Sequence, residues 1–378
     1  MQVNKRKILA ISGVAERIGG SNAALVENIV HMRNRYDFLV VLPSSGTFGD
    51  QLDELGIDWI VINSKRWRSN GTTGIVRKLM KVVYNQVAEV KLKKVIKQEK
   101  IDIVHINVSA IDVGVSAAKW TRTPLIWHLR EKNDDMPLDL KLWAQRRFMQ
   151  ADKLLAASEY IKGHFQDYIG KDVAIEVLPD GVDFSTIKTF EPRHTGSADH
   201  TFVFGFGGGL AEHKRIDVVL AAMSKLTEKV DFKLIVAGTG DAAEFKTMLD
   251  NYGIDESRVE FMGYLNNLNE LFEKVDIMIS ASIEAFGRVA VEARAAGKII
   301  VGADAGATKD ILTKGHISPI FTYGDGQSLA NKLIEIIENF DEEQRVVSAE
   351  TQLYRDRYGV EEVVKKLSVA YEDVLNEE

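Results

Sequence analysis

Two glutamates in the stretch from Ser280 to Gly297 have residue types and a spacing that could do chemistry. Glu284 and Glu292 stand eight positions apart, with Gly287 and an expected helix start between them. Eight helical positions cover ~12 Å, about the reach needed to hold both ends of a sugar nucleotide. A glycine and a helix start would bring backbone amides to a phosphate, and carboxylates accept several hydrogen bonds from hydroxyl groups. Since a pair of glutamates on a soluble helix is more often simply solvated, the surrounding chain must decide between the two interpretations.

The elements that would position these glutamates alternate between strand and helix patterns in two series. Strands are predicted at 8–13, 38–42, 59–62, 102–107, 124–129, 153–158 and 174–178, and then at 202–209, 232–238, 258–263, 276–280, 298–303 and 318–321. In the second series helices are predicted near 215–228, 241–252, 266–274, 288–296, 307–313 and 327–339, with a final amphipathic helix from about 360 to 375. This alternation predicts an α/β fold of two doubly wound parallel sheets, which bind ligands at the carboxyl ends of their strands.

The length of 378 residues exceeds one hydrophobic core, so we expect two domains. A polar segment without periodicity at 189–200 indicates a linker. The expected organisation is therefore a first Rossmann-like domain at 1–188, the linker at 189–200, a second Rossmann-like domain at 201–358, and a terminal helix at 359–378. We expect this terminal helix to pack back towards the first domain.

The composition excludes several classes of site. The chain has no cysteine, which excludes disulfides, thiolate zinc sites and a catalytic thiol, and which fits a reducing cytosol. The apolar run near residue 8 is too short for a signal peptide, and no stretch is long enough to span a membrane, so we expect a soluble, cytoplasmic protein. Neither a dinucleotide nor a P-loop fingerprint occurs, and no metal-binding spacing appears, so we expect no metal and no cofactor.

Ten short motifs in order along the chain resemble those of the retaining glycosyltransferases of family 4 (glycosyl transferases group 1), which have the GT-B fold of two Rossmann-like domains facing across a cleft. The motif of two glutamates is Glu284 to Glu292, enclosing Ala285-Phe286-Gly287. The other matching segments are 19–20, 102–105, 127–131, 157–162, 179–183, Gly208-Gly209-Leu210 with Lys214, 235–241, 261–265 and 292–312. The resemblance implies that the first domain binds the acceptor and that the second binds a nucleotide sugar.

The resemblance also implies roles for residues of the second domain. Glu292 would hold the ribose hydroxyls, Glu284 would hold hydroxyls of the donor sugar, and Lys214 would compensate the charge of the departing diphosphate. Stabilising that developing charge is the main task of such a site. The backbone groups that would cradle the sugar and its phosphates, or face the base, belong to Phe286, Gly287, Arg288, Tyr264 and Leu265.

In the first domain, the resemblance places Gly20 near the phosphates and His128 opposite the donor sugar. The alternative for His128 is a hydrogen-bonded histidine that ends a buried strand. The neighbouring Arg130 and Glu131, at the carboxyl end of the same predicted strand, favour a functional interpretation and are candidates for the acceptor side.

One departure from the family pattern bears on activity. Gly209 stands where the family has a phosphate-binding arginine, which removes a bidentate donor. Arg215, next to Lys214, is a candidate substitute, although it could equally be a surface residue at a helix start. This departure motivates an alternative function, a catalytically silent partner subunit of another transferase. A sugar-nucleotide epimerase on the same fold is a further alternative.

A basic segment at residues 65–100 holds 11 Lys and Arg against Glu89 and Glu99, on a chain whose net charge is −7. A long helix is predicted at 71–98, with a stripe of Val76, Leu79, Met80, Val83, Val87 and Val90 at helical spacing. One interpretation is that this stripe faces the core and that the cationic side is solvated. The other is peripheral attachment to an anionic membrane, with Trp67 at the interface. Nucleic acid is not an expected partner, because nothing resembles a base-reading module.

The expected activity is a metal-independent, retaining transfer of a hexose or N-acetylhexosamine from a UDP- or GDP-linked sugar to a hydroxyl acceptor. The nucleotide diphosphate sugar would be a co-substrate, and the acceptor a growing polysaccharide, a lipid-linked sugar or a glycoprotein. No dedicated carboxylate nucleophile is evident in the first domain. The resemblance therefore implies departure and attack on the same face of the sugar, with the diphosphate helping to deprotonate the acceptor.

Overall fold

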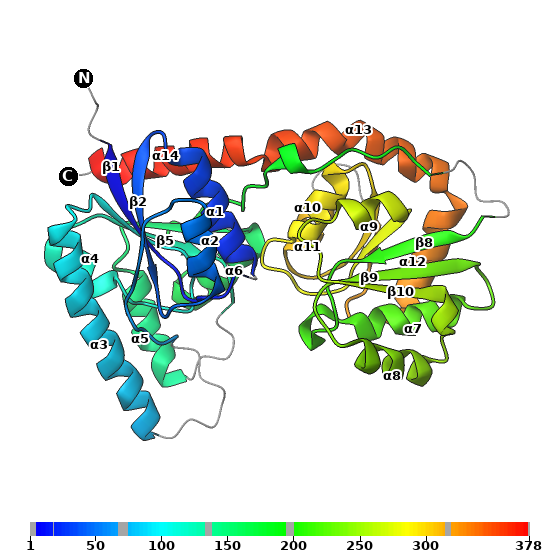
Figure 1. The fold of residues 1–378 in the computed structure, drawn as a ribbon, viewed down its shortest axis with the longest axis horizontal. Coiled ribbons are helices and arrows are strands. Elements are labelled where there is room, and N and C mark those ends of the chain that lie inside the picture. Colours follow the sequence, from blue (N-terminus) through cyan, green and yellow to red (C-terminus); the bar gives the residue numbers. More distant parts are fainter. Residues whose placement is uncertain are drawn as a thin grey trace. The chain divides into compact units, whose positions relative to one another are not determined.

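The computed structural model describes residues 5–17, 19–66, 75–132, 138–193, 200–313 and 319–376. It divides into two compact units (Figure 1). The N-terminal unit comprises Met1–Gly181 and Val360–Glu378, and the C-terminal unit comprises Val182–Gly359. The division falls earlier than the expected end at 188, and the terminal helix belongs to the N-terminal unit.

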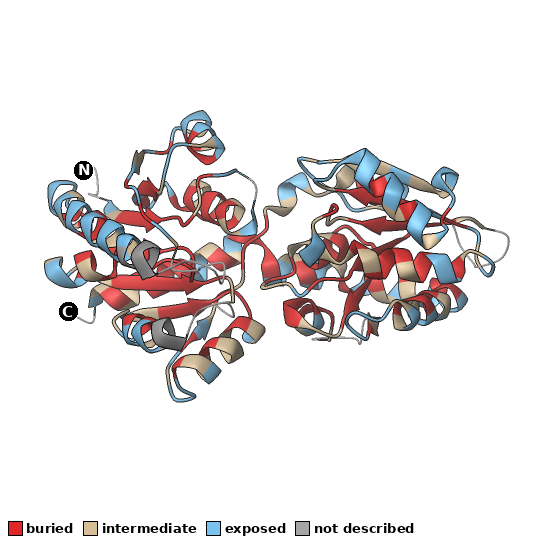
Figure 2. Ribbon diagram, turned by 90° about the horizontal axis from the view of Figure 1, so that it is seen from below, coloured by how far each residue is buried: buried red, intermediate tan, exposed pale blue. Residues whose placement is uncertain are grey.

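The N-terminal unit is built on a parallel sheet of seven strands in the order β3-β2-β1-β4-β5-β6-β7. Its strands are β1 (Arg6–Ile11), β2 (Tyr36–Leu42), β3 (Trp59–Val61), β4 (Ile103–Ile106), β5 (Leu125–Leu129), β6 (Lys153–Ala156) and β7 (Glu176–Val177). Its helices are α1 (Gly20–Met32), α2 (Thr47–Glu54), α3 (Ile75–Gln98), α4 (Val115–Thr121), α5 (Leu138–Phe148), α6 (Glu159–Ile169) and α14 (Val360–Asn376). The central strands are buried on both faces, and apart from His105 and His128 they are mostly apolar, because helices cover both sides of the sheet (Figure 2).

The C-terminal unit has a parallel sheet of six strands in the order β10-β9-β8-β11-β12-β13. Its strands are β8 (Phe202–Phe206), β9 (Phe232–Ala237), β10 (Val259–Gly263), β11 (Ile277–Ser280), β12 (Ile299–Ala303) and β13 (Ile320–Phe321). Its α-helices are α7 (Ile216–Leu226), α8 (Ala242–Tyr252), α9 (Asn269–Lys274), α10 (Arg288–Ala295), α11 (Gly306–Thr313), α12 (Gly326–Glu338) and α13 (Phe340–Tyr358). Short 3-10 turns lie at Phe184–Thr186, Glu212–Lys214 and Glu256–Arg258. The prediction of two doubly wound parallel sheets is confirmed.

Helix α14 closes the core of the N-terminal unit. Its apolar face, which includes Val363, Leu367 and Tyr371, packs into the same buried cluster as β1, β2 and α1. The Tyr371 hydroxyl lies 2.7 Å from Nδ1 of His105 on β4, so this contact fixes the helix to the sheet by a buried hydrogen bond as well as by apolar burial.

Helix α3 corrects one expectation. The stripe predicted to face the core is exposed over its described part: Met80 is 53%, Val83 is 62%, Val87 is 51% and Val90 is 60% exposed. The face that packs on the domain instead carries Ala88, Glu89, Leu92 and Ile96, which are all buried. The core-facing interpretation was therefore wrong for this stripe, because a second set of residues at helical spacing covers the domain. Trp67 and Arg68 lie outside the described residues.

Candidate functional site

The two charged residues at the centre of the C-terminal site follow neighbouring strands. Lys214 ends the turn after β8, and Glu284 lies in the loop after β11. Strand β8 pairs with β9 on one side and with β11 on the other, so the strand order reverses between β8 and β11. Such a reversal is where open α/β sheets bind ligands, beyond the carboxyl ends of the strands. The fold thus brings the predicted lysine and glutamate together at the expected place.

Lys214 and Glu284 form an ion pair in this structure. Nζ of Lys214 donates to Oε1 of Glu284 at 2.7 Å, and the Ser282 hydroxyl donates to the same oxygen. Burial alone would raise the pKa of Glu284, but the Lys214 ammonium and these two hydrogen bonds outweigh it and lower the pKa below its ordinary value. Glu284 is therefore ionised at neutral pH and accepts hydrogen bonds. Sequence reasoning missed Ser282, although its position two residues before Glu284 was a usable signal.

The loop that carries Glu284 is fixed by contacts with the start of α11. The Ala307 amide donates to the Glu284 carbonyl at 2.8 Å. A Cβ atom on Gly306 would lie 2.8 Å from both the amide nitrogen and the carbonyl oxygen of Glu284, so only glycine allows this approach. The backbone of Glu284 is consequently fixed while its carboxylate stays partly accessible, with 26% of the side chain exposed.

The start of α10 lies beside this loop. Gly287 is its N-cap and has a φ of 84°, a left-handed conformation that glycine adopts without strain. The Thr308 hydroxyl on α11 lies 3.0 Å from the place where a Cβ of Gly287 would be, and it is buried without a hydrogen-bond partner in the described part of the chain. A helix start with an unsatisfied hydroxyl next to it is suited to accept an anion or a hydroxyl group.

Other predicted residues of this unit lie around the same edge. Glu292, on the second turn of α10, accepts a hydrogen bond from Nε of Arg288 at 2.7 Å. The two side chains thus form an ion pair with each other in this structure. Phe286 is buried against the Tyr358 ring, with centroids 5.9 Å apart, so its ring is not available to a ligand. The two residues expected near a base follow strand β10, where Tyr264 is exposed and Leu265 is half-buried.

Gly209 has a structural reason for being glycine. Its φ is 65°, and a Cβ there would lie 2.3 Å from the carbonyl oxygen of Thr239 and 2.7 Å from the Thr239 nitrogen. Hydrogen bonds from the amides of Gly209 and Leu210 tie this loop to the end of β9 at 3.0 and 2.8 Å. The position where the family has an arginine is thus packed on backbone here, and no side chain fits without moving the loop.

Arg215 is bound away from Lys214. Its guanidinium donates to both oxygens of Asp217, with Nε–Oδ1 and Nη2–Oδ2 distances of 2.9 Å. It also lies 5.2 Å from the centroid of the Tyr323 ring. The Arg215 backbone is left-handed, with a φ of 62°. The structure therefore gives Arg215 a role in fixing the start of α7, and a contact with phosphate would require it to leave Asp217.

In the N-terminal unit, Gly19 and Gly20 lie at the start of α1, whereas His128 lies on β5 and Arg130 and Glu131 follow that strand. Gly19 is the N-cap of α1, and a Cβ on either Gly19 or Gly20 would meet nothing within 4 Å, so this helix start is open to a ligand. Asn107, just after β4, donates to the Ser21 carbonyl at 2.9 Å. Strands β1 and β4 are neighbours at which the strand order reverses, so the start of α1 at Gly20 lies at the edge where sheets of this kind bind ligands. Asn107 had not been singled out from the sequence.

His128 lies inside the N-terminal unit, with 0% of its surface exposed. Its Nε2 is 3.1 Å from the Leu178 carbonyl, and its Nδ1 is 3.1 Å from Nη2 of Arg130, so the ring is a neutral donor and acceptor. Burial, with the Arg130 charge beside it, lowers the pKa of His128 well below its ordinary value. In this conformation His128 cannot contact a donor sugar. The structure instead agrees with the alternative interpretation, in which His128 is a buried, hydrogen-bonded histidine.

The two candidates for the acceptor side are also engaged. Arg130 is buried and ion-paired with Asp180, and burial lowers its pKa to about 9. Glu131 is partly exposed and accepts from Nη2 of Arg66 at 2.7 and 2.9 Å. Among the described residues no cluster of three or more His, Asp or Glu could hold a metal ion, and none of the described helices has the length and apolarity needed to cross a membrane.

Comparison with known proteins places both units in one family. Residues 18–186 match the family described as Glycosyltransferase Family 4, and residues 187–352 match Glycosyl transferases group 1. The chain is 29% identical over 237 residues to N-acetyl-alpha-D-glucosaminyl L-malate synthase of Bacillus anthracis, covering 61% of each chain. It is 27% identical over 226 residues to phosphatidyl-myo-inositol mannosyltransferase of Mycobacterium leprae, covering 58% of this chain and 59% of that one. The chain thus spans about three fifths of the length of these curated relatives.

Solved structures share the whole fold. The structure of Anabaena Alr3699/HepE in complex with UDP has a TM-score of 0.80 at 22% identity and covers 98% of this chain and 100% of that chain. A glycosyltransferase from Rickettsia africae ESF-5 also has a TM-score of 0.80, at 20% identity and with 99% of each chain covered. The predicted GT-B class of two Rossmann-like units is confirmed by this likeness.

Proposed function

Because the chain belongs to the family 4 glycosyltransferases, we propose that it moves a hexose or N-acetylhexosamine from a nucleotide diphosphate sugar to a hydroxyl acceptor. The observation that carries this proposal is the pairing of Lys214 with Glu284 where the strand order reverses, beside the start of α10. A cation, an ionised carboxylate and a helix start within one loop cluster suit a ligand that joins an anion to a polyhydroxyl ring.

The ion pair suggests how the site would respond to its donor. A diphosphate has more charge than one carboxylate, so it would compete for the Lys214 ammonium and release Glu284 to accept hydrogen bonds from the sugar. Lys214 and the amides at the start of α10 would then compensate the charge that develops on the leaving diphosphate. No protein-held metal is needed in this scheme, and we propose a metal-independent reaction.

We further propose that the reaction retains the anomeric configuration. The lowered pKa of Glu284 keeps its carboxylate ionised and paired with Lys214. In this state the carboxylate accepts hydrogen bonds from hydroxyl groups and has no proton to donate. The acceptor proton would pass to the departing diphosphate. The product's configuration, read by NMR against the donor's, tests this point directly.

The identity of donor and acceptor can be tested in one series. Thermal shifts with UDP, GDP and their sugars should single out one nucleotide, and Glu284→Gln should abolish transfer from the sugar nucleotide while the free nucleotide still binds. Glu256→Gln is a matched control, because Glu256 forms an exposed ion pair with Lys246 in the same unit. The named relatives suggest L-malate and phosphatidyl-myo-inositol as two chemically different acceptors to include. No binding of any nucleotide diphosphate would refute the proposal.

A second candidate is a catalytically silent partner subunit, which the glycine at position 209 favours. The packing of Gly209 on Thr239 weakens this alternative, since it explains the missing arginine by loop geometry. Sugar-nucleotide hydrolysis or transfer by the isolated chain would exclude it.

A further inference from the structure

Helix α3 presents an apolar stripe that nothing in the described chain covers. Met80, Val83, Val87 and Val90 follow one another at steps of three and four, so they lie along one side of the helix. Between 51% and 62% of each residue is exposed, and Tyr84 next to them is 46% exposed. Single exposed apolar residues are ordinary, but a continuous stripe on one helix indicates an interaction surface.

Helix α5 has exposed apolar residues of its own. Leu142 is 67% exposed, and Met149, which directly follows the helix, is 57% exposed. Leu142, Arg146 and Met149 are three or four positions apart and therefore lie on one side of α5. We call the exposed apolar residues Met80, Val83, Val87 and Val90 of α3 the apolar patch.

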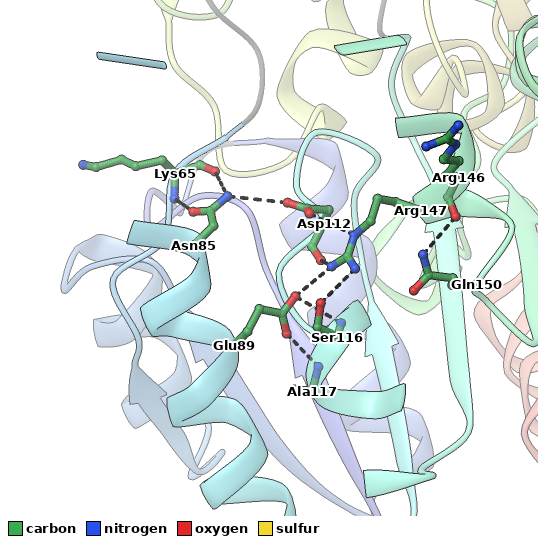
Figure 3. Close-up of polar contacts among 9 residues, drawn as sticks. All are labelled: Lys65, Asn85, Glu89, Asp112, Ser116, Ala117, Arg146, Arg147 and Gln150. Carbon is green, nitrogen blue, oxygen red and sulfur yellow. Dashed lines mark hydrogen bonds and ion pairs between the residues drawn. The ribbon is translucent and has the colours of Figure 1, made fainter. Parts of the chain in front are cut away.

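Helices α3 and α5 are fixed to the same buried ion cluster. Figure 3 shows the Arg147 guanidinium between the carboxylates of Glu89 and Asp112, at 2.9 and 3.1 Å. Arg147 also donates to the Ser116 hydroxyl at 2.8 Å, and Glu89 accepts from the Ala117 amide at 2.8 Å. Arg147 belongs to α5 and Glu89 to α3, whereas Ser116 and Ala117 belong to α4. The ion cluster therefore holds these three helices together.

The charge around the patch is of one sign. The only carboxylate in α3 is that of Glu89, which is buried in the ion cluster. Lys91 and Lys94 lie next to the exposed valines, and in the described part of the chain neither forms an ion pair. Lys93 lies 5.6 Å from the ring centroid of the exposed Trp120. A surface with apolar residues at its centre and lysines around it matches the interface of an anionic bilayer.

We propose that the apolar patch of α3 docks on an anionic lipid surface. A second copy of this chain is the less suitable occupant, because it would bring the lysines of two α3 helices together without carboxylates to pair them. The proposal is independent of the sugar-transfer proposal, since it concerns no residue of the Lys214 and Glu284 site.

The test is sedimentation of the full chain with vesicles of phosphatidylcholine, with and without phosphatidylglycerol. The wild type should bind the anionic vesicles at low salt and leave them at high salt. Lys91→Glu with Lys94→Glu should weaken partition about 25-fold or more, since each lysine near such a surface contributes about a fivefold preference. Val83→Gln with Val87→Gln and Val90→Gln should weaken it about 100-fold, as half of each valine loses its burial in the bilayer.

The matched control lies on α14, the terminal helix of the same unit. Val369 is 60% exposed and Lys365 is 74% exposed there, so Val369→Gln with Lys365→Glu changes the same residue types away from the patch. This control should bind like the wild type, and thermal unfolding should show all variants folded. Equal wild-type binding to neutral and anionic vesicles, unchanged partition of both α3 variants, or equal loss in the control would each overturn the proposal. A dimer in sedimentation velocity that the valine variant abolishes, without lipid binding, would assign the patch to a second copy and also overturn it.

Discussion

Replacing Gly209 with alanine should destabilise the protein more than replacing Gly253, although the two glycines have almost the same backbone conformation. Their φ angles are 65° and 64°. A Cβ on Gly253 would meet nothing within 4 Å, whereas one on Gly209 would lie 2.3 Å from the Thr239 carbonyl oxygen. The pair of variants therefore separates the cost of a left-handed side chain from the cost of a backbone contact.

The expected magnitudes follow from these two terms. A left-handed conformation costs a residue with a Cβ about 1–2 kcal/mol, which is the whole effect at Gly253. At Gly209 the loop must also move away from Thr239, and overpacking of this kind adds about 1–3 kcal/mol. We therefore expect Gly253→Ala to lose about 1–2 kcal/mol and Gly209→Ala to lose about 2–5 kcal/mol of the free energy of unfolding.

Urea denaturation followed by circular dichroism measures both losses, provided that the slope with denaturant is unchanged. An equal loss in the two variants would refute the argument that Gly209 is fixed by the approach to Thr239. The same reasoning predicts that Gly209→Arg, which restores the residue typical of the family, does not improve nucleotide binding. A tighter complex with UDP or GDP in that variant would show that the loop accepts the arginine, and the close approach would then not be a constraint.

Three further perturbations test other parts of the structure. Lys214→Met should weaken binding of the nucleoside diphosphate ~10- to 100-fold in calorimetry, the value of one charge-assisted contact, while Lys246→Met leaves it unchanged. His105 is buried and neutral, because burial lowers its pKa to about 3, so only the unfolded chain takes up its proton between pH 6.5 and about 3. Stability should accordingly fall as the pH is lowered through this window, and His105→Asn should reduce the slope of unfolding free energy by about 1.4 kcal/mol per pH unit near pH 5; an unchanged slope would contradict the assignment. Arg147→Met should cost about 3–5 kcal/mol at pH 7 by leaving two carboxylates buried without a cation. The loss should shrink as the pH is lowered, because burial raises the pKa of Glu89 and of Asp112 and protonation removes the unpaired charge. A loss that does not change with pH, or an equal loss in the exposed neighbour Arg146→Met, would argue against this cause.

The fold could be predicted from the sequence because both sheets consist of short apolar strands buried on two sides. The run at 276–280 contains strand β11, and the run at 232–238 contains β9. The prediction missed helix α13, which is rich in charged residues and has few apolar positions. Its place is fixed by contacts that only the folded chain creates: Arg294 of α10 forms a buried ion pair with Glu350, and the Tyr354 hydroxyl donates to the Ile311 carbonyl at 2.9 Å.

The candidate site was predictable to the extent that it depends on strand order. Lys214 and Glu284 lie 70 positions apart, yet each follows a strand, and a doubly wound sheet brings such positions together. What the sequence did not contain is the direction of each side chain. His128 ends a strand as expected, but its ring turns into the interior, where the Leu178 carbonyl and Arg130 satisfy both nitrogens. A motif gives the position of a residue, and burial decides whether a ligand can reach it.

Helix α3 shows why periodicity identifies an apolar stripe but does not identify the surface that the stripe contacts. Its sequence carries apolar residues on two sides, and a helical repeat cannot say which side meets the domain. The decision falls to Glu89, which stands on the side of Leu92 and must be buried to reach the Arg147 guanidinium and the amide of Ala117. A helix anchored by such a pair cannot turn its other side inward without leaving those charges unpaired. The apolar patch is therefore held outward by the ion cluster, where it is accessible to the lipid surface that we propose as its partner.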